Sequence, residues 1–206
     1  MKINTIRLRA VLGTLAILLP WIVAILNGSI PKSISATYFS ASCITPFMII
    51  LGASSILLIC YKGYELIDDI ILSLSGVFGL MICLFPTSSP LYETVGTFQL
   101  DAGVSSTIHN ISAFIFFGLL SYNSFFLFTK GSSNPTRNKK IRNIIYRVCG
   151  VGMLASFLLL LLPSFYIQIW LVETVALFFF GVSFLTKADI FPFLFCDTAF
   201  TDDIAM

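Results

Sequence analysis

The sequence has little charge and a single histidine, and these shortages exclude several classes of protein. Only 11% of the 206 residues are charged, whereas 57% are hydrophobic, and the mean hydropathy is +0.96. Such a composition excludes a soluble globular domain and is typical of a chain that folds within a bilayer. One histidine, His109, cannot form the multi-histidine metal sites of many membrane hydrolases. We expect neither a metal nor a cofactor.

The spacing of the cysteines shows no ligand pattern. The five cysteines are Cys43, Cys60, Cys83, Cys149 and Cys196. None forms a CxxC pair, and none has a histidine close in sequence, so a zinc site is not expected. Whether Cys43 and Cys83 form a disulfide is left open by the sequence.

Long hydrophobic stretches, in contrast, occupy most of the chain. A helix needs about twenty apolar residues to cross the hydrocarbon core, and six stretches approach this length. They cover residues 10–26, 41–61, 66–86, 107–129, 144–163 and 165–186. None alternates with period two, which favours helices over the strands of a barrel. We therefore expect an all-α polytopic protein: one six-helix transmembrane domain, in which residues 187–206 form a tail.

Lys and Arg are missing from alternate connections between these stretches. Eleven of the twelve lie on one set of connections: before the first stretch, between the second and third, between the fourth and fifth or just inside the fifth, and after the sixth. The other set of connections contains only Lys32. Basic residues stay in the cytoplasm when loops are short. This pattern places both termini in the cytoplasm and residues 27–40, residues 87–106 and the turn at Pro163 and Ser164 outside. We expect the membrane to be the plasma membrane. Topology explains the basic residues, so no nucleic-acid partner is expected.

Small residues within the stretches predict how the helices associate. Lipid tails are as apolar as the side chains, so helices need close backbone approach and a few polar contacts. Ser75 and Gly79, and also Gly152 and Ser156, have the small-x-x-x-small spacing that permits this. We interpret them as packing seams, or as contacts of a homo-oligomer. The phenylalanines, including Phe178 to Phe180, are expected mainly to face lipid.

Two ionisable residues lie within the outer half of the predicted membrane. His109 is about one turn into the fourth stretch, and Glu173 is in the sixth. An ionisable group at this depth needs a partner or a water-filled cavity, which predicts a polar groove open to the outer leaflet. The expected lining residues are Ser35, Thr37, Tyr38, Thr87, Glu93, His109, Ser112 and Glu173. His109, Glu173 and Asp101 are also the candidates for catalysis, although a satisfied buried pair of the His109 imidazole with a carboxylate is the favoured interpretation.

Charged residues of both signs also meet near the predicted cytoplasmic surface. Asp68 and Asp69 begin the third stretch, Lys62 precedes it, and Arg142 and Arg147 begin the fifth. We expect ion pairs among them that determine which helices are neighbours. A cytoplasmic ligand pocket is the alternative.

Several of these segments resemble a known family. The loop Pro31–Thr37, which reads PKSISAT, looks like the Ile-Ser-Asp-Thr loop after the first helix of the damage-regulated autophagy modulator superfamily, with Ala36 in place of Asp. Leu84–Thr87, followed by His109, Ala113, Phe116 and Phe117, is similar to related small bacterial six-helix membrane proteins. The resemblance implies six helices with cytoplasmic termini, a role in lipid organisation or membrane regulation, and His109, Ile34, Ser35 and Thr37 as site residues.

Three functions are compatible with these features. The first is a non-enzymatic protein that binds or organises membrane lipids through the outer groove. The second is a membrane-embedded hydrolase or transferase with His109 as its base. The third is an oligomeric pore or gated membrane effector assembled through the small-residue seams.

Overall fold

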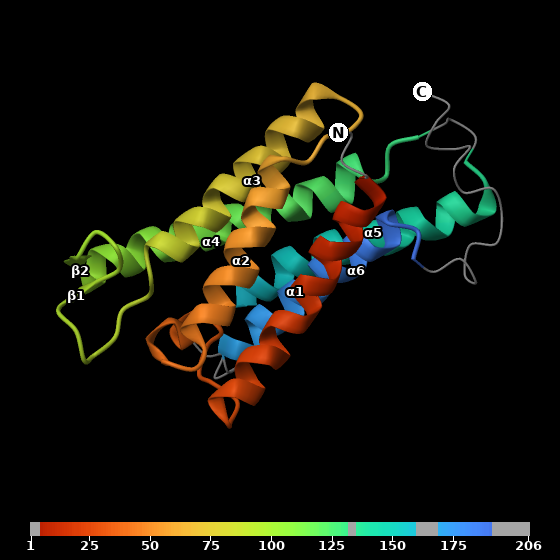
Figure 1. The fold of residues 1–206 in the computed structure, drawn as a ribbon. Coiled ribbons are helices and arrows are strands. Elements are labelled where there is room, and N and C mark those ends of the chain that lie inside the picture. Colours follow the sequence, from red (N-terminus) through yellow and green to blue (C-terminus); the bar gives the residue numbers. More distant parts are fainter. Residues whose placement is uncertain (1–4, 132–134, 160–168, 191–206) are drawn as a thin grey trace.

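The computed structural model describes residues 5–131, 135–159 and 169–190, and six α-helices dominate it (Figure 1). The α-helices are α1 (Thr5–Asn27), α2 (Ile44–Ile59), α3 (Leu66–Leu84), α4 (Ala102–Tyr122), α5 (Arg137–Leu159) and α6 (Ile169–Lys187). A 3-10 helix, η1 (Ser35–Phe39), lies in the first loop, and a π-helix, η2 (Asn123–Leu127), continues α4. Two strands, β1 (Thr94–Val95) and β2 (Leu100–Asp101), pair antiparallel. The expected all-α class is confirmed.

Five of the helices are long and apolar enough to cross a membrane. These are α1, α3, α4 together with η2, α5 and α6, whereas α2 has only 16 residues. The chain is therefore best described as an integral, multi-pass membrane protein; the sixth span and the cytoplasmic termini stay predictions. α5 begins at Arg137, seven residues before the predicted stretch, because the basic segment there is also helical. The expected turn at Pro163 and Ser164 lies outside the described residues, as does the tail from residue 191.

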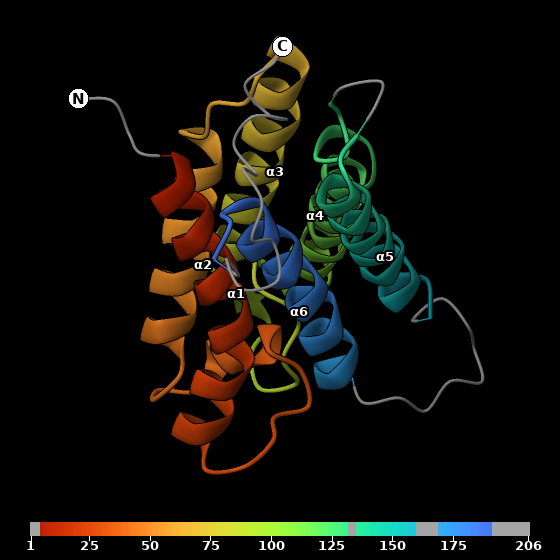
Figure 2. The ribbon, with the colours of Figure 1, turned by 90° about the vertical axis from the view of Figure 1, so that its right-hand side faces the viewer.

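The six helices form a closed ring in sequence order. Each packs against the helix that follows it, and α6 also packs against α1. Figure 2 shows α6 between α1 and α5. The helices therefore alternate in direction, and one end of the ring carries the first loop and the α3–α4 loop, which we call the loop end. The other end, which we call the basic end, carries every described Lys and Arg except Lys32.

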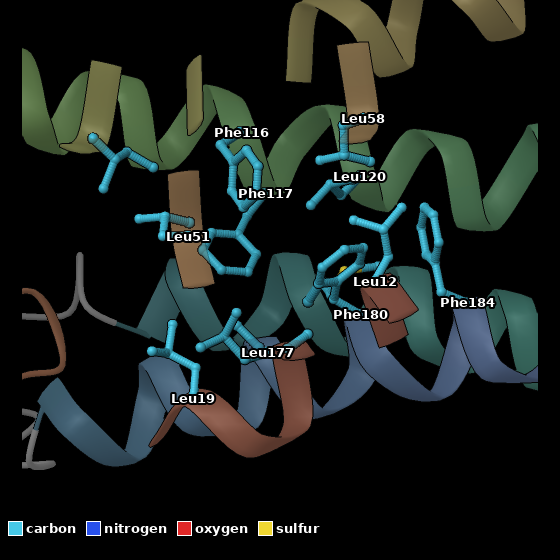
Figure 3. Close-up of a cluster of buried hydrophobic side chains, with 14 of the residues drawn as sticks. Leu12, Leu19, Leu51, Leu58, Phe116, Phe117, Leu120, Leu177, Phe180 and Phe184 are labelled. Carbon is cyan, nitrogen blue, oxygen red and sulfur yellow. The ribbon is translucent and has the colours of Figure 1, made fainter. Parts of the chain in front are cut away.

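Large apolar side chains fill the middle of this ring (Figure 3). The ring of Phe116 from α4 lies edge to face with that of Phe180 from α6, and the ring of Phe117 stacks on Phe157 of α5. The rings of Phe180 and Phe184 also pack edge to face, with their centroids 4.7 Å apart. Leucines from α1, α2 and α4 complete the cluster. The expectation that Phe180 faces lipid is wrong, since its side chain is buried; Phe178, two positions earlier, is exposed.

The outward surface of the ring is apolar as well. Exposed large hydrophobic residues occur on every helix, among them Val11, Ile49, Val77, Ile111, Val148 and Phe178. Soluble monomers rarely expose a continuous apolar surface of this extent. The surface matches the hydrocarbon interior of a bilayer, in agreement with the five long helices.

Both predicted small-residue seams are used inside the bundle. A Cβ at Gly79 would collide with the Ser55 hydroxyl of α2, and one at Gly152 would collide with the Phe179 ring of α6. Ser75 and Ser156 are buried. These small residues therefore serve packing between helices of the same chain. Because the seams are filled within one chain, a homo-oligomer would need another surface.

The sequence did not single out a close crossing between α1 and α6. At the crossing of α1 and α6, a Cβ at Gly181 would lie 2.7 Å from the carbonyl oxygen of Gly13.

We expect Gly181→Ala to destabilise the fold by about 1–3 kcal/mol, because a backbone atom cannot move aside as a side chain can. Thermal unfolding in detergent measures this. Gly118→Ala on α4 is the matched control, since nothing lies within 4 Å of its Cβ position; equal melting temperatures for the two variants would contradict the close crossing.

Candidate functional site

Glu173 anchors the first loop to α6 at the loop end. Its carboxylate accepts a hydrogen bond from the Ser33 hydroxyl at 3.0 Å and one from the backbone N–H of Ile34 at 2.5 Å. Ser35, at the start of η1, also faces this carboxylate. Free N–H groups at the start of a helix attract negative charge, so the carboxylate and η1 are suited to each other. Glu173 thus binds backbone rather than pairing with His109.

The rest of the first loop completes this contact. The backbone N–H of Trp170 donates to the carbonyl of Lys32 at 3.0 Å, one turn before Glu173 on α6. The Thr37 hydroxyl donates to the carbonyl of Ile34 at 2.5 Å, and Tyr38 packs on the apolar core. On the opposite side, the ring of Phe39 stacks on Tyr92 of the α3–α4 loop at 5.8 Å. The loop is therefore held between α6 and the α3–α4 loop, as a cap on the loop end.

His109 on α4 holds the residue that follows α3, as Glu173 on α6 holds the first loop. Its Nδ1 lies 2.8 Å from the carbonyl oxygen of Phe85, which follows the last residue of α3. A carbonyl can only accept, so Nδ1 carries a proton. One turn earlier, the Ser105 hydroxyl donates to the carbonyl of Pro86 at 2.8 Å. Both side chains hold the start of the α3–α4 loop. Glu173 is therefore not a carboxylate partner of His109, because the two side chains bind different groups.

Asp101, the third catalytic candidate, caps a helix. Its carboxylate accepts from the backbone N–H groups of Gly103 and Val104, at 2.9 and 3.1 Å. This is the usual way in which an aspartate satisfies the first turn of a helix. Glu93, which was expected to line the groove, has an exposed side chain, and its backbone carbonyl accepts from the N–H of Ala102 at 2.9 Å.

Three other polar atoms at the loop end lack a partner. Within the described part of the chain, the hydroxyls of Thr87 and Ser112 and the indole N–H of Trp170 are buried without a hydrogen bond. Thr87 follows Pro86, which Ser105 contacts, and Ser112 is one turn from His109. A buried polar group without a partner costs about 1–3 kcal/mol, so these atoms are the strongest local indication of a ligand. Trp170 was not in the predicted set.

Charged residues at the basic end form two ion-pair groups. Lys62 contacts Asp69 at 2.9 Å, while Lys130 contacts Glu65 at 2.7 Å and Asp68 at 3.4 Å. The layer expected from the sequence is thus present in part. Asp68 and Asp69 pair with lysines rather than with Arg142 or Arg147: Arg147 is exposed, and Arg142 is buried on α5. Lys130 and Glu65 were missed.

Arg9 is a further buried cation at this end. Its Nε donates to the Tyr61 hydroxyl at 2.7 Å, and its guanidinium lies over the rings of Tyr61 and Tyr64. Burial raises the pKa of Tyr61 above its usual value, although the charge of Arg9 opposes this change. The phenol therefore stays protonated at neutral pH. The sequence carried no sign of this contact, because residues 9 and 61 meet only when α1 packs beside α2.

Burial by itself would lower the pKa of Lys130, but its hydrogen bond to Glu65 and the nearby charge of Asp68 raise the pKa above its usual value. Lys130 is therefore charged at neutral pH. Its side chain is partly buried, and that of Asp68 is almost fully buried.

Comparisons of the chain with protein-family models, with curated proteins and with solved structures found no match. In the described residues, no three His, Cys, Asp or Glu side chains lie close enough together to hold a metal ion. Cys43, Cys60, Cys83 and Cys149 are free, so Cys43 and Cys83 are not bridged.

Replacing Glu173 tests the anchor of the first loop. Glu173→Ala should leave the Ile34 N–H without its acceptor and cost about 1–3 kcal/mol. We expect faster hydrogen exchange at Ile34, measured by mass spectrometry of peptides from the first loop. Glu93→Ala is the control, because the Glu93 side chain is exposed. Unchanged exchange in the Glu173 variant would show that the loop is held by other contacts.

The two lysine pairs should differ in strength. Lys130→Met leaves the buried Asp68 without a cation and should cost about 1–2 kcal/mol. Lys62→Met, whose side chain is 76% exposed, should cost under about 0.5 kcal/mol. Because Lys130 keeps its charge until the pH exceeds its raised pKa, the difference should persist at neutral and mildly alkaline pH. Unfolding of both variants at pH 7 measures it, and the reverse order would contradict this account.

Proposed function

We propose that this chain is a non-enzymatic membrane protein that binds a lipid at its loop end. The observation that carries the proposal is the set of three buried polar atoms there, on Thr87, Ser112 and Trp170, that have no partner in the described chain. The loop end is then the outer face, because the basic end stays in the cytoplasm of a plasma-membrane protein.

The non-enzymatic part is supported by the roles of the three acid–base candidates. Glu173 binds the backbone of the first loop, His109 binds the end of α3, and Asp101 caps α4. A general base has to reach a proton of the substrate, or a water, at about 3 Å. Each of these side chains is instead used to hold the chain itself. This favours lipid binding over the hydrolase or transferase alternative.

A lipid is supported as the ligand by the surroundings of the three atoms. The two helices that carry Ser112 and Trp170 expose apolar side chains to the bilayer, including Ile111 and Phe114 on α4 and Leu171 on α6. A headgroup with hydroxyl or phosphate oxygens could bond to hydroxyl and indole donors, while its acyl chains lie on the apolar surface. The middle of the ring is filled by Phe and Leu side chains, which makes a pore through one copy of the chain the weaker alternative.

A double variant, Thr87→Val with Ser112→Ala, tests this function. Removing hydroxyls that have no partner should leave the melting temperature unchanged or raise it, because no bond within the chain is lost. Bound lipid, measured by native mass spectrometry of the protein in mild detergent, should fall.

Ser75→Ala is the matched control, because the Ser75 hydroxyl bonds only to the backbone of its own helix. It should leave bound lipid unchanged. Undiminished lipid in the double variant would refute a lipid site at the loop end.

A further inference from the structure

Most of the described cations at the basic end already have a partner. Lys62 and Lys130 pair with carboxylates at the start of α3, and Arg9 donates to the Tyr61 hydroxyl. Four others have interactions of their own: Arg7, Lys139, Arg142 and Lys187. None of these seven residues is therefore free.

The three other described cations at this end differ, and all of them are on α5. The side chains of Arg137, Lys140 and Arg147 are exposed, and within the described residues none of them has a hydrogen bond, an ion pair or a ring contact. α5 itself contains no Asp or Glu, so no carboxylate one turn away on the same helix can pair with them. Their positive charges are therefore not compensated by the described chain.

These three residues share one face of α5. Lys140 and Arg147 are seven residues apart, which is two turns, or about 10 Å of helical rise. Arg137 lies one turn before Lys140. A molecule with negative charge that approaches this face therefore meets all three cations.

Apolar side chains continue the same face toward the middle of the membrane. After Lys140, the residues Ile144, Val148, Val151 and Leu158 follow one another at spacings of three, four or seven residues. Their exposed fractions lie between 44% and 61%. We call these four residues and the three cations the α5 face. It is positive at the basic end and apolar beyond it.

Arg147 lies at the boundary of the hydrocarbon core. The hydrophobic stretch of this helix begins at residue 144, so Arg147 is one turn inside it, whereas Arg137 and Lys140 precede it. Helical side chains tilt toward the N-terminus of their helix, which for α5 is at the basic end, and this favours a guanidinium directed toward the headgroups. A lipid-facing cation at this depth needs an anion, and the anions of this layer are lipid phosphates.

We propose that the α5 face binds an anionic phospholipid of the leaflet at the basic end. The guanidinium of Arg147 donates to phosphate oxygens, for which its planar fork is suited, and Lys140 and Arg137 attract the net negative charge of the headgroup. An acyl chain lies along Val148 and Val151. A lipid is the occupant rather than an acidic protein, because Arg147 belongs to the apolar, membrane-facing part of the helix. This lipid lies in the leaflet opposite to that of the loop end.

Competition between two lipids tests the site. The full chain in mild detergent receives equal amounts of phosphatidylglycerol and phosphatidylcholine with the same acyl chains, and native mass spectrometry counts the bound molecules. The wild type should prefer phosphatidylglycerol, because phosphatidylcholine has no net negative charge. Arg147→Gln should reduce this preference roughly fivefold, as expected for one cation beside anionic lipid, and adding Lys140→Gln should reduce it further. Arg147→Lys, which keeps the charge, should reduce it less.

Lys62→Gln is the matched control. It removes the same charge at the same end, from a side chain that is 76% exposed but pairs with Asp69, and should leave the preference nearly unchanged. The α5 variants should melt like the wild type, because their side chains have no bond within the described chain to lose, so weaker binding cannot be attributed to misfolding. An equal reduction by Lys62→Gln would show that only the net charge of this end matters, and would overturn the α5 site.

The loop-end variant Thr87→Val with Ser112→Ala separates the two lipid sites. Its total bound lipid falls if the proposed function holds, but its preference for phosphatidylglycerol should remain that of the wild type. Loss of the preference in this variant would assign the anionic lipid to the loop end. An unchanged preference in both Gln variants of α5, or no preference in the wild type, would also refute the α5 site.

Discussion

Inside an apolar bundle that faces hydrocarbon, a polar group must find its partner within the chain, because no water is available to replace it. Glu173 shows the consequence most clearly. Its carboxylate is held by the Ser33 hydroxyl and the Ile34 N–H, so the charge that α6 carries into the bundle also determines where the first loop lies. His109 does the same for the α3–α4 loop through the Phe85 carbonyl. Glu173 and His109 therefore hold the two loops of the loop end in place.

The same constraint separates structural residues from those free to bind a ligand. Glu173, His109 and Asp101 have the chemistry of acid–base catalysts, yet each is satisfied by backbone groups. The neutral side chains at the loop end that keep an unsatisfied polar atom, on Thr87, Ser112 and Trp170, are less conspicuous in a sequence, and the proposal of a ligand rests on them.

Much of the architecture was predictable, because membrane helices have a strong local signal. Five of the six stretches appear as helices long enough to span, and α2 is shorter than its stretch because residues 41–43 form a turn. The small residues at Gly79 and Gly152 were recognised as packing positions, but their neighbours were not. The partners of His109 and Asp68 were predicted incorrectly. His109 binds the backbone carbonyl of Phe85, and Asp68 pairs with Lys130, which is far from it in sequence. A sequence does not show which of these groups will lie nearest in the folded chain.

By itself, the sequence determined the helical class, the polar character of α4 and the segregation of Lys and Arg to one end, because these properties depend on local hydropathy and on the order of segments along the chain. Only the tertiary structure decided that α6 closes the ring against α1, that Arg9 reaches Tyr61, and that Asn123 is buried without a partner. These features arise where segments that are distant in sequence meet. Such contacts depend on the packing of whole helices, and they produce no repeating pattern of residues in the sequence.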